Sequence, residues 1–251
     1  MLRFIRIFSV KISAAKKSLI LNLAASRIQK DARTVIFTPN TQMLLAARKN
    51  PALRELLDRS TVNIPDGIGV CMAARILNGK RLERCSGIDF AEELLKISEQ
   101  QHLRVFFLGG ECGVADQAKK AMKKRFSRIC ICGTHHGYFD KYGKENSSVL
   151  KKINSARPDL LFVCFGFPLQ EEWILKNIDR LPSVKLAIGL GGTFDVWSGR
   201  CKRAPSSVQK LGLEWLWRML RDPRRAKTAV QIPEFLWLVI KSKAAFAARK
   251  Q

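Results

Sequence analysis

Small and polar residues follow the apolar runs of this sequence, and their types suit the chemistry of a bound polar ligand. The runs are Thr34–Phe37, Val62–Ile64, Val105–Leu108, Leu160–Phe165 and Leu186–Leu190. The residues that follow them are Thr38 and Asn40, Asp66, Gly109 and Gly110, Gln170 and Glu171, and Gly191 and Asp195. If the runs are parallel strands of one sheet, these residues meet beyond its carboxyl edge, where open parallel sheets bind their ligands.

Two aspartates of this set are open to two interpretations each. Asp66 stands between a proline and a glycine, so it suits a tight turn, and a carboxylate there can also act as a general base aimed into a cleft. The residues alone favour the turn. Asp195 follows Gly191-Gly192-Thr193-Phe194, and it suits either a ligand-binding role or the cap of a helix.

The pair Gly109-Gly110 lies between a strand-like run and a helix-like run from about residue 114 to 126. Such a turn lets the backbone approach a phosphate at a helix N-terminus. The segment is neither GxGxxG nor a Walker A loop. A plain tight turn therefore explains it equally well.

Metal chemistry finds no support in the sequence. It contains no Asp-x-Asp pair of the kind that holds a divalent metal on a diphosphate, and its histidines and cysteines lack metal-ligand spacing. The seven cysteines sit mostly in apolar runs, as small buried residues of a reducing compartment do. We therefore expect no metal and no other cofactor. A diphosphate would then need arginines, for which Arg84, Arg203, Arg218, Arg224 and Arg225 are candidates, although each also suits a solvated surface.

The charge balance points to an anionic partner. The 251 residues include 45 Lys+Arg against 21 Asp+Glu, a net charge of +24. Nucleic acid, anionic lipid and phosphorylated substrates all fit this excess. We expect no signal peptide and no transmembrane helix, because no apolar stretch is long enough.

The elements that position these residues alternate between strand and helix. This pattern predicts an α/β fold, a Rossmann-like and mostly parallel sheet covered by helices, over residues 1–200. Residues 201–251 lack strand patterns and combine aromatic with basic residues, which predicts a C-terminal helical appendage. This appendage suits either a membrane interface or ordinary packing on its own domain.

Taken in order, several segments resemble the WecG/TagA/CpsF family, glycosyltransferase family 26. They are TPNTQMLLAAR (38–48), NIPDGIGV (63–70), RCSGIDF (84–90), FFLGGECGVADQA (106–118), GFPLQEEWI (166–174), GLGGTFDVWSG (189–199), KRAP (202–205) and GLEWLWRMLRDPRR (212–225). Each segment is weak evidence, but their order over roughly residues 34 to 235 is specific.

The resemblance implies an inverting, metal-independent transfer from a UDP-sugar to a polyprenyl-diphosphate-linked saccharide in surface-polysaccharide synthesis. It implies a donor of the N-acetylmannosamine or glucose type and a peripheral place at the inner face of the cytoplasmic membrane. By the family's motifs, Asp66 is the base, Thr38 and Asn40 lie at the sugar pocket, and Arg84 and Gln170 belong to the site. The appendage arginines that close over the diphosphate are Arg218 and Arg225. A further family arginine is replaced here by Thr228, so either Lys227 or Arg224 substitutes for it or the appendage closes differently.

Two other classes remain as alternatives. A dinucleotide-dependent enzyme would use Gly109-Gly110, but the missing GxGxxG disfavours it. A nucleic-acid-binding protein would explain the charge and leave the polar strand ends unexplained. We therefore expect an anionic membrane surface and no nucleic acid as a partner, and we leave a homo-oligomer open.

Overall fold

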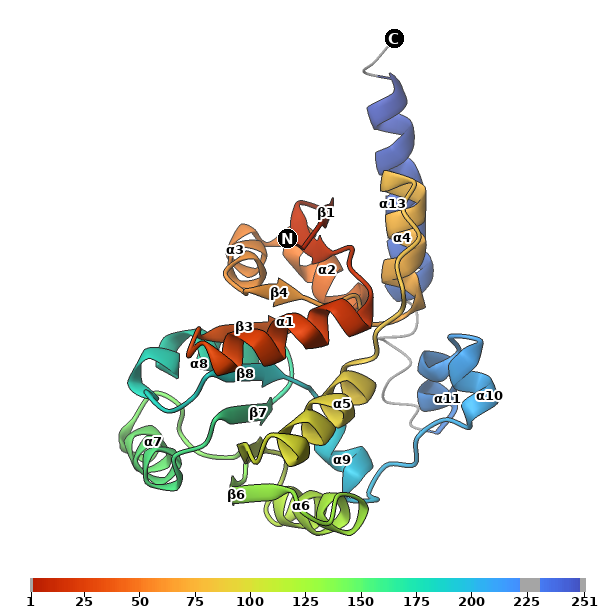
Figure 1. Ribbon diagram of the computed structural model, residues 1–251. Helices are drawn as coiled ribbons and strands as arrows, with labels where there is room; N and C mark the ends of the chain where they lie inside the picture. The colour runs from red at the N-terminus through yellow and green to blue at the C-terminus, as the bar shows by residue number, and fades with distance from the viewer. Residues whose placement is uncertain (1, 222–230, 249–251) are drawn as a thin grey trace.

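The computed structural model describes residues 2–221 and 231–248 and contains the expected parallel sheet (Figure 1). The apolar runs form its strands because residues buried on both faces favour continuous β-branched and aromatic stretches. The strands are β3 (Thr34–Phe37), β4 (Val62–Asn63), β5 (Arg104–Gly109), β6 (Cys130–His135), β7 (Leu160–Cys164) and β8 (Leu186–Gly189). Their order is β4-β3-β8-β7-β5-β6, and every neighbouring pair is parallel.

Successive side chains of each strand enter two separate cores. On β5, Phe106 and Leu108 face one core, whereas Val105 and Phe107 face the other. The second core is covered by α1 (Lys17–Gln29), α5 (Gly87–Gln100), α6 (Val114–Arg125) and α9 (Thr193–Trp197). Figure 1 shows α1, α5 and α6 on this near face of the sheet.

The first core lies on the opposite face of the sheet. Its helices are α2 (Thr41–Lys49), α3 (Pro51–Asp58), α4 (Ile68–Asn78), α7 (Lys144–Ala156), α8 (Leu169–Asn177), the 3₁₀ helix η1 (Ile178–Arg180) and α13 (Gln231–Ala248). Helices on both faces of a parallel sheet confirm the predicted α/β class.

The N-terminal residues form a hairpin that the sequence patterns did not indicate. β1 (Phe4–Ile7) pairs antiparallel with β2 (Val10–Ser13). The turn residues Phe8 and Ser9 both have positive φ, of 48° and 67°. A turn of this kind normally carries Asn or Gly, so the usual hairpin pattern is missing here.

The C-terminal region is helical, as predicted. It contains α10 (Ser206–Lys210), α11 (Glu214–Arg221) and α13. Phe235, Leu238 and Val239 of α13 are buried in the same core as the sheet, and Figure 1 shows α13 running beside α4. Over the described ranges, no helix combines the length and the apolar character needed to cross a bilayer.

Candidate active site

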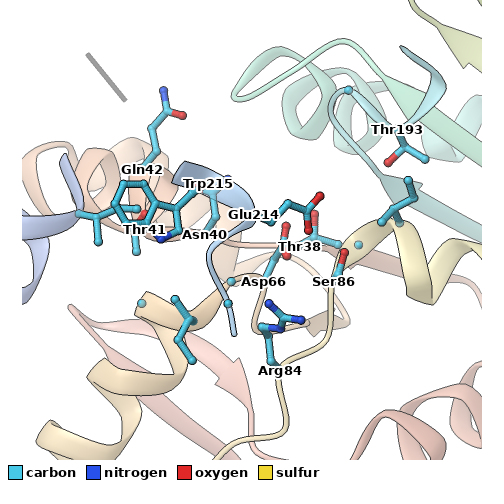
Figure 2. A pocket seen from close by; sticks show the side chains of 18 of the residues that line it. Thr38, Asn40, Thr41, Gln42, Asp66, Arg84, Ser86, Thr193, Glu214 and Trp215 are labelled. Atoms are coloured by element: carbon cyan, nitrogen blue, oxygen red, sulfur yellow. The ribbon is translucent and has the colours of Figure 1, made fainter. Parts of the chain in front are cut away.

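A pocket of about 450 Å³ opens beyond the carboxyl ends of β3, β4 and β8 (Figure 2). It lies where the loops after these strands meet the appendage. Its lining residues are Thr38, Asn40, Thr41, Gln42, Asp66, Gly67, Ile68, Gly69, Arg84, Ser86, Gly87, Ile88, Leu190, Gly192, Thr193, Gly212, Glu214, Trp215 and Ile232. The fold therefore brings together Thr38, Asn40, Asp66 and Arg84, the residues for which the sequence predicted catalytic roles.

Thr38 and Asn40 are held by the loop that follows β3. Thr38 is 7% exposed and donates a hydrogen bond from Oγ1 to the carbonyl of Gly189, 3.2 Å away. Asn40 caps α2, because its Oδ1 accepts from the N–H of Met43 at 3.0 Å. The positions of both side chains are thus fixed before any ligand binds.

The loop that carries Asp66 is joined by backbone hydrogen bonds to its neighbours. The N–H of Asp66 donates to the carbonyl of Pro39 at 3.1 Å, and Cys85 donates to Pro65 at 3.1 Å. Gly67 has φ +87°, which lets α4 start directly after the aspartate. Asp66 is therefore a turn residue whose side chain also lines the pocket.

Three helices begin at the pocket wall. Residues 40–42 open α2, residues 67–69 open α4 and residues 86–88 open α5. A helix N-terminus carries unpaired N–H groups and a partial positive charge. Together these N-termini favour a negatively charged ligand in the pocket.

Arg84 adds a full positive charge to this wall. It makes no hydrogen bond or ion pair within the residues that the structure describes, and Figure 2 shows its guanidinium below Asp66 and Ser86.

Burial raises the pKa of the neighbouring Cys71 to about 11 and that of Cys85 to about 12. Both thiols therefore stay protonated at neutral pH.

The turn Gly109-Gly110 lies outside the pocket lining. The N–H of Gly110 donates to the carbonyl of Cys164 at 3.0 Å, and a Cβ on Gly109 would collide with that same carbonyl. Close packing of β5 on β7 is thus a sufficient reason for this glycine. A role of the turn in substrate binding stays a prediction.

Gln170 and Glu171 lie beneath the loop that follows β8 and are 3% and 0% exposed. The Gln170 amide donates to Glu171 Oε1 at 2.8 Å, and its oxygen accepts from the N–H of Gly191 at 2.9 Å. Asp195 lies in the first turn of α9. Neither these residues nor Gly191 lines the pocket, so their contact with substrate stays a prediction. Gln170 supports the pocket wall through its hydrogen bond to Gly191, which lies between the lining residues Leu190 and Gly192.

Of the other arginines predicted to bind the diphosphate, only the side chain of Arg203 lies within the described residues. Arg203 lies 2.6 Å from Asp89 and 3.9 Å from Glu214, so it joins α5 to α11 and does not line the pocket. The side chain of Arg218 lies outside the described residues, as do Arg224, Arg225, Lys227 and Thr228. The roles of these residues in binding the diphosphate stay predictions.

Residues of the appendage also line the pocket, and the sequence did not single them out. Glu214 and Trp215 come from α11, and Ile232 comes from α13. Thr193, at the start of α9, was missed as well. The available signal was Glu214 itself, one of two acidic residues in the basic segment 212–225, the other being Asp222.

Helices on both faces of a parallel sheet, with a polar pocket at its carboxyl edge, define an α/β protein whose pocket lies where such sheets bind their ligands. Sequence comparison gives the family: the chain belongs to the WecG/TagA/CpsF family of glycosyl transferases, whose profile matches residues 5–249. It is thus a glycosyltransferase, as the resemblance predicted.

Three relatives bear the same descriptive name, N-acetylglucosaminyldiphosphoundecaprenol N-acetyl-β-D-mannosaminyltransferase. The Bacillus spizizenii protein is 34% identical over 230 residues, 92% of this chain and 88% of the relative. The Bacillus subtilis protein is 37% identical over 207 residues, 82% and 79%. The Staphylococcus aureus (strain MRSA252) protein is 36% identical over 208 residues, 83% and 80%.

Proposed function

We propose that this protein transfers an N-acetylmannosamine-type sugar from a UDP-sugar to a polyprenyl-diphosphate-linked N-acetylglucosamine, with inversion at the anomeric carbon. The observation that carries the proposal is the pocket, which Asp66 and Arg84 line together with the N-termini of α2, α4 and α5. The names of the relatives support the choice of sugars and of the lipid-linked acceptor.

The proposed reaction is a single displacement. An acceptor hydroxyl oxygen forms a bond to the anomeric carbon as the bond from that carbon to the UDP oxygen breaks. Asp66 takes the proton of the hydroxyl, and UDP leaves with the electron pair of the broken bond. Thr38 and Asn40, fixed by their own hydrogen bonds, position the sugar.

The leaving diphosphate is stabilised by protein groups in this proposal. Arg84 faces the pocket, and the helix N-termini supply further positive potential. The resemblance adds Arg218 and Arg225 from the appendage. Such fixed cations act on the charge as it develops, which is the role that a divalent metal has in other transferases.

We further propose that the enzyme works as a peripheral protein at the cytoplasmic face of the membrane. The outer face of α13 supports this: Trp237 is 59% exposed and Ile240 is 58% exposed. Lys241 lies over the Trp237 ring, 5.1 Å from its centroid. An aromatic residue beside basic residues suits the interface of an anionic membrane.

The test is an assay of the purified full chain with a panel of UDP-sugars and polyprenyl-diphosphate-linked N-acetylglucosamine. We expect transfer with UDP-N-acetylmannosamine and an increase in the melting temperature with UDP, but not with NAD or an oligonucleotide. Transfer from another UDP-sugar alone would correct the donor. A lack of both transfer and stabilisation by UDP would overturn the proposed function.

A further inference from the structure

Helix α11 carries a carboxylate and an indole into the pocket from outside the parallel sheet. In Figure 2 the carboxylate of Glu214 lies on the same side as Asp66, Thr38 and Ser86. The indole of Trp215 lies beside Asn40 and Thr41. Consecutive residues of one helix therefore cover two sides of the same cavity.

Glu214 lies beside an arginine that is anchored to the α/β domain. Nε of Arg203 lies 3.9 Å from Oε1 of Glu214, and Nη2 of Arg203 lies 2.6 Å from Oδ1 of Asp89 on α5. The side chains of Arg203 and Glu214 are only 20% and 16% exposed, so solvent screens this arrangement weakly. Asp89 thus holds Arg203 beside the Glu214 carboxylate, at a distance longer than a hydrogen bond.

The start of α11 is also fixed by close packing. Gly212, which precedes the helix, has φ +76°, and a Cβ at this position would lie 2.9 Å from Cβ of Ile68 on α4. Only glycine fits both the conformation and the space. The helix is therefore seated against the same α4 N-terminus that follows Asp66.

An ionised carboxylate accepts hydrogen bonds from hydroxyl groups, and an indole offers a flat apolar face with a polar edge. A hexopyranose presents hydroxyls around its rim and C–H groups on its faces, so it matches both side chains at once. Adjacent Glu214 and Trp215 therefore have the chemistry of a sugar subsite.

We propose that Glu214 and Trp215 form the subsite for the acceptor sugar, with Arg203 and Asp89 as positioning residues. This rests on the proposed function, in which Asp66 is the base. The base must reach the attacking hydroxyl, which belongs to the acceptor. A carboxylate on the same side of the pocket as Asp66 then meets the neighbouring hydroxyls of that acceptor.

The test compares Glu214→Gln and Trp215→Ala with the wild type, measuring KM for the acceptor, KM for the UDP-sugar and the affinity for UDP. Glutamine keeps an oxygen for Arg203 and removes the charge. Loss of a charged hydrogen bond to a hydroxyl predicts an acceptor KM about tenfold to a hundredfold higher. The donor KM, the UDP affinity and the slow hydrolysis of the UDP-sugar by water should stay close to those of the wild type.

Two further variants separate binding from structure. Asp89→Asn weakens the support of Arg203 and should raise the acceptor KM less than Glu214→Gln does. Glu55→Gln removes the same charge from an exposed position on α3 and should change neither the acceptor KM nor the donor KM. If Trp215→Ala lowers the melting temperature by several degrees, Trp215→Phe, which keeps an aromatic face, replaces it.

An unchanged acceptor KM in Glu214→Gln and in the Trp215 variant would overturn the subsite and leave the proposed function intact. An equal rise in the donor KM, or a loss of UDP affinity, would assign the pair to the donor and would also overturn the acceptor assignment. Absence of transfer by the wild type would overturn the proposed function and this inference together.

Discussion

Gln170 donates a hydrogen bond to the carboxyl of Glu171 inside the protein, with 2.8 Å between Nε2 and Oε1. Glu171 is fully buried, and its Oε2 has no hydrogen-bond partner in the described part of the chain. Burial raises the pKa of this carboxyl from 4.5 to about 8, in spite of the hydrogen bond from Gln170, which lowers it. Glu171 therefore keeps its proton at neutral pH.

This pKa predicts a loss of stability with rising pH. The folded state holds a proton that the unfolded chain releases above its own pKa of about 4.5, so the free energy of unfolding should fall between pH 4.5 and about 8. Glu171→Gln keeps the hydrogen bond to Gln170 and removes the ionisation. Urea denaturation across this range should show a shallower decline in the variant, and identical slopes would contradict the buried neutral carboxyl.

Asp66→Asn should fold normally and lose most of its activity. Asparagine suits the same tight turn, and the backbone hydrogen bond to Pro39 does not involve the side chain. Loss of a general base typically lowers the rate by about 10²–10⁴-fold. Turnover is measured beside a melting curve, and near-normal turnover by a folded variant would remove Asp66 from the mechanism.

Transfer should survive removal of divalent metals. The sequence lacks an Asp-x-Asp pair, and Arg84 and the helix N-termini take the charge role in the proposed mechanism. The measurement is turnover in EDTA, with and without added magnesium or manganese. Activity that EDTA abolishes and either metal restores would show that arginines are not sufficient for the leaving group.

Phe8→Ala should loosen the C-terminal helix. The Phe8 ring meets Phe235 of α13 edge-on, with centroids 5.5 Å apart, and Arg48 lies over the same ring. A fully buried Phe→Ala change costs about 3–5 kcal/mol, so this half-buried position should cost about 2 kcal/mol. Limited proteolysis should cut near α13 faster than in the wild type, and an unchanged cleavage rate would show that Phe8 does not hold the helix.

A matched variant at the same turn should leave α13 in place. Ser9 has φ 67°, a conformation that costs an L-residue about 1–2 kcal/mol relative to glycine. Ser9→Gly should therefore keep α13 as protected as in the wild type and not lower the melting temperature.

Lys241→Glu should weaken attachment to anionic vesicles. Basic side chains contribute about 1 kcal/mol each near such a surface, so a charge reversal should lower the partition coefficient by roughly tenfold or more at low salt. Lys96→Glu, an exposed change on α5, is the control. Flotation that is equal for both variants and the wild type would show that the outer face of α13 does not meet the membrane.

Much of the site was predictable because its residues follow strands. Parallel strands bury both faces, so Thr34–Phe37 and Leu186–Gly189 are continuous apolar runs that end at one edge of the sheet. Polar residues that follow strands, such as Thr38 after β3 and Asp66 after β4, then converge by geometry alone. Arg84 lies in a loop with no such pattern, so the residues alone made it one of five candidate arginines, and the motif order of the family singled it out.

The tertiary structure decided which polar residues face the pocket and which support it. Gln170 and Glu171 follow β7 as Thr38 follows β3, yet packing of α8 on the sheet turns both inward, where no solvent competes for their hydrogen bonds. Arg203 has the charge of a phosphate ligand but is paired with Asp89. Contacts between residues so distant in the chain depend on how helices pack, and no local spacing in the sequence encodes that packing.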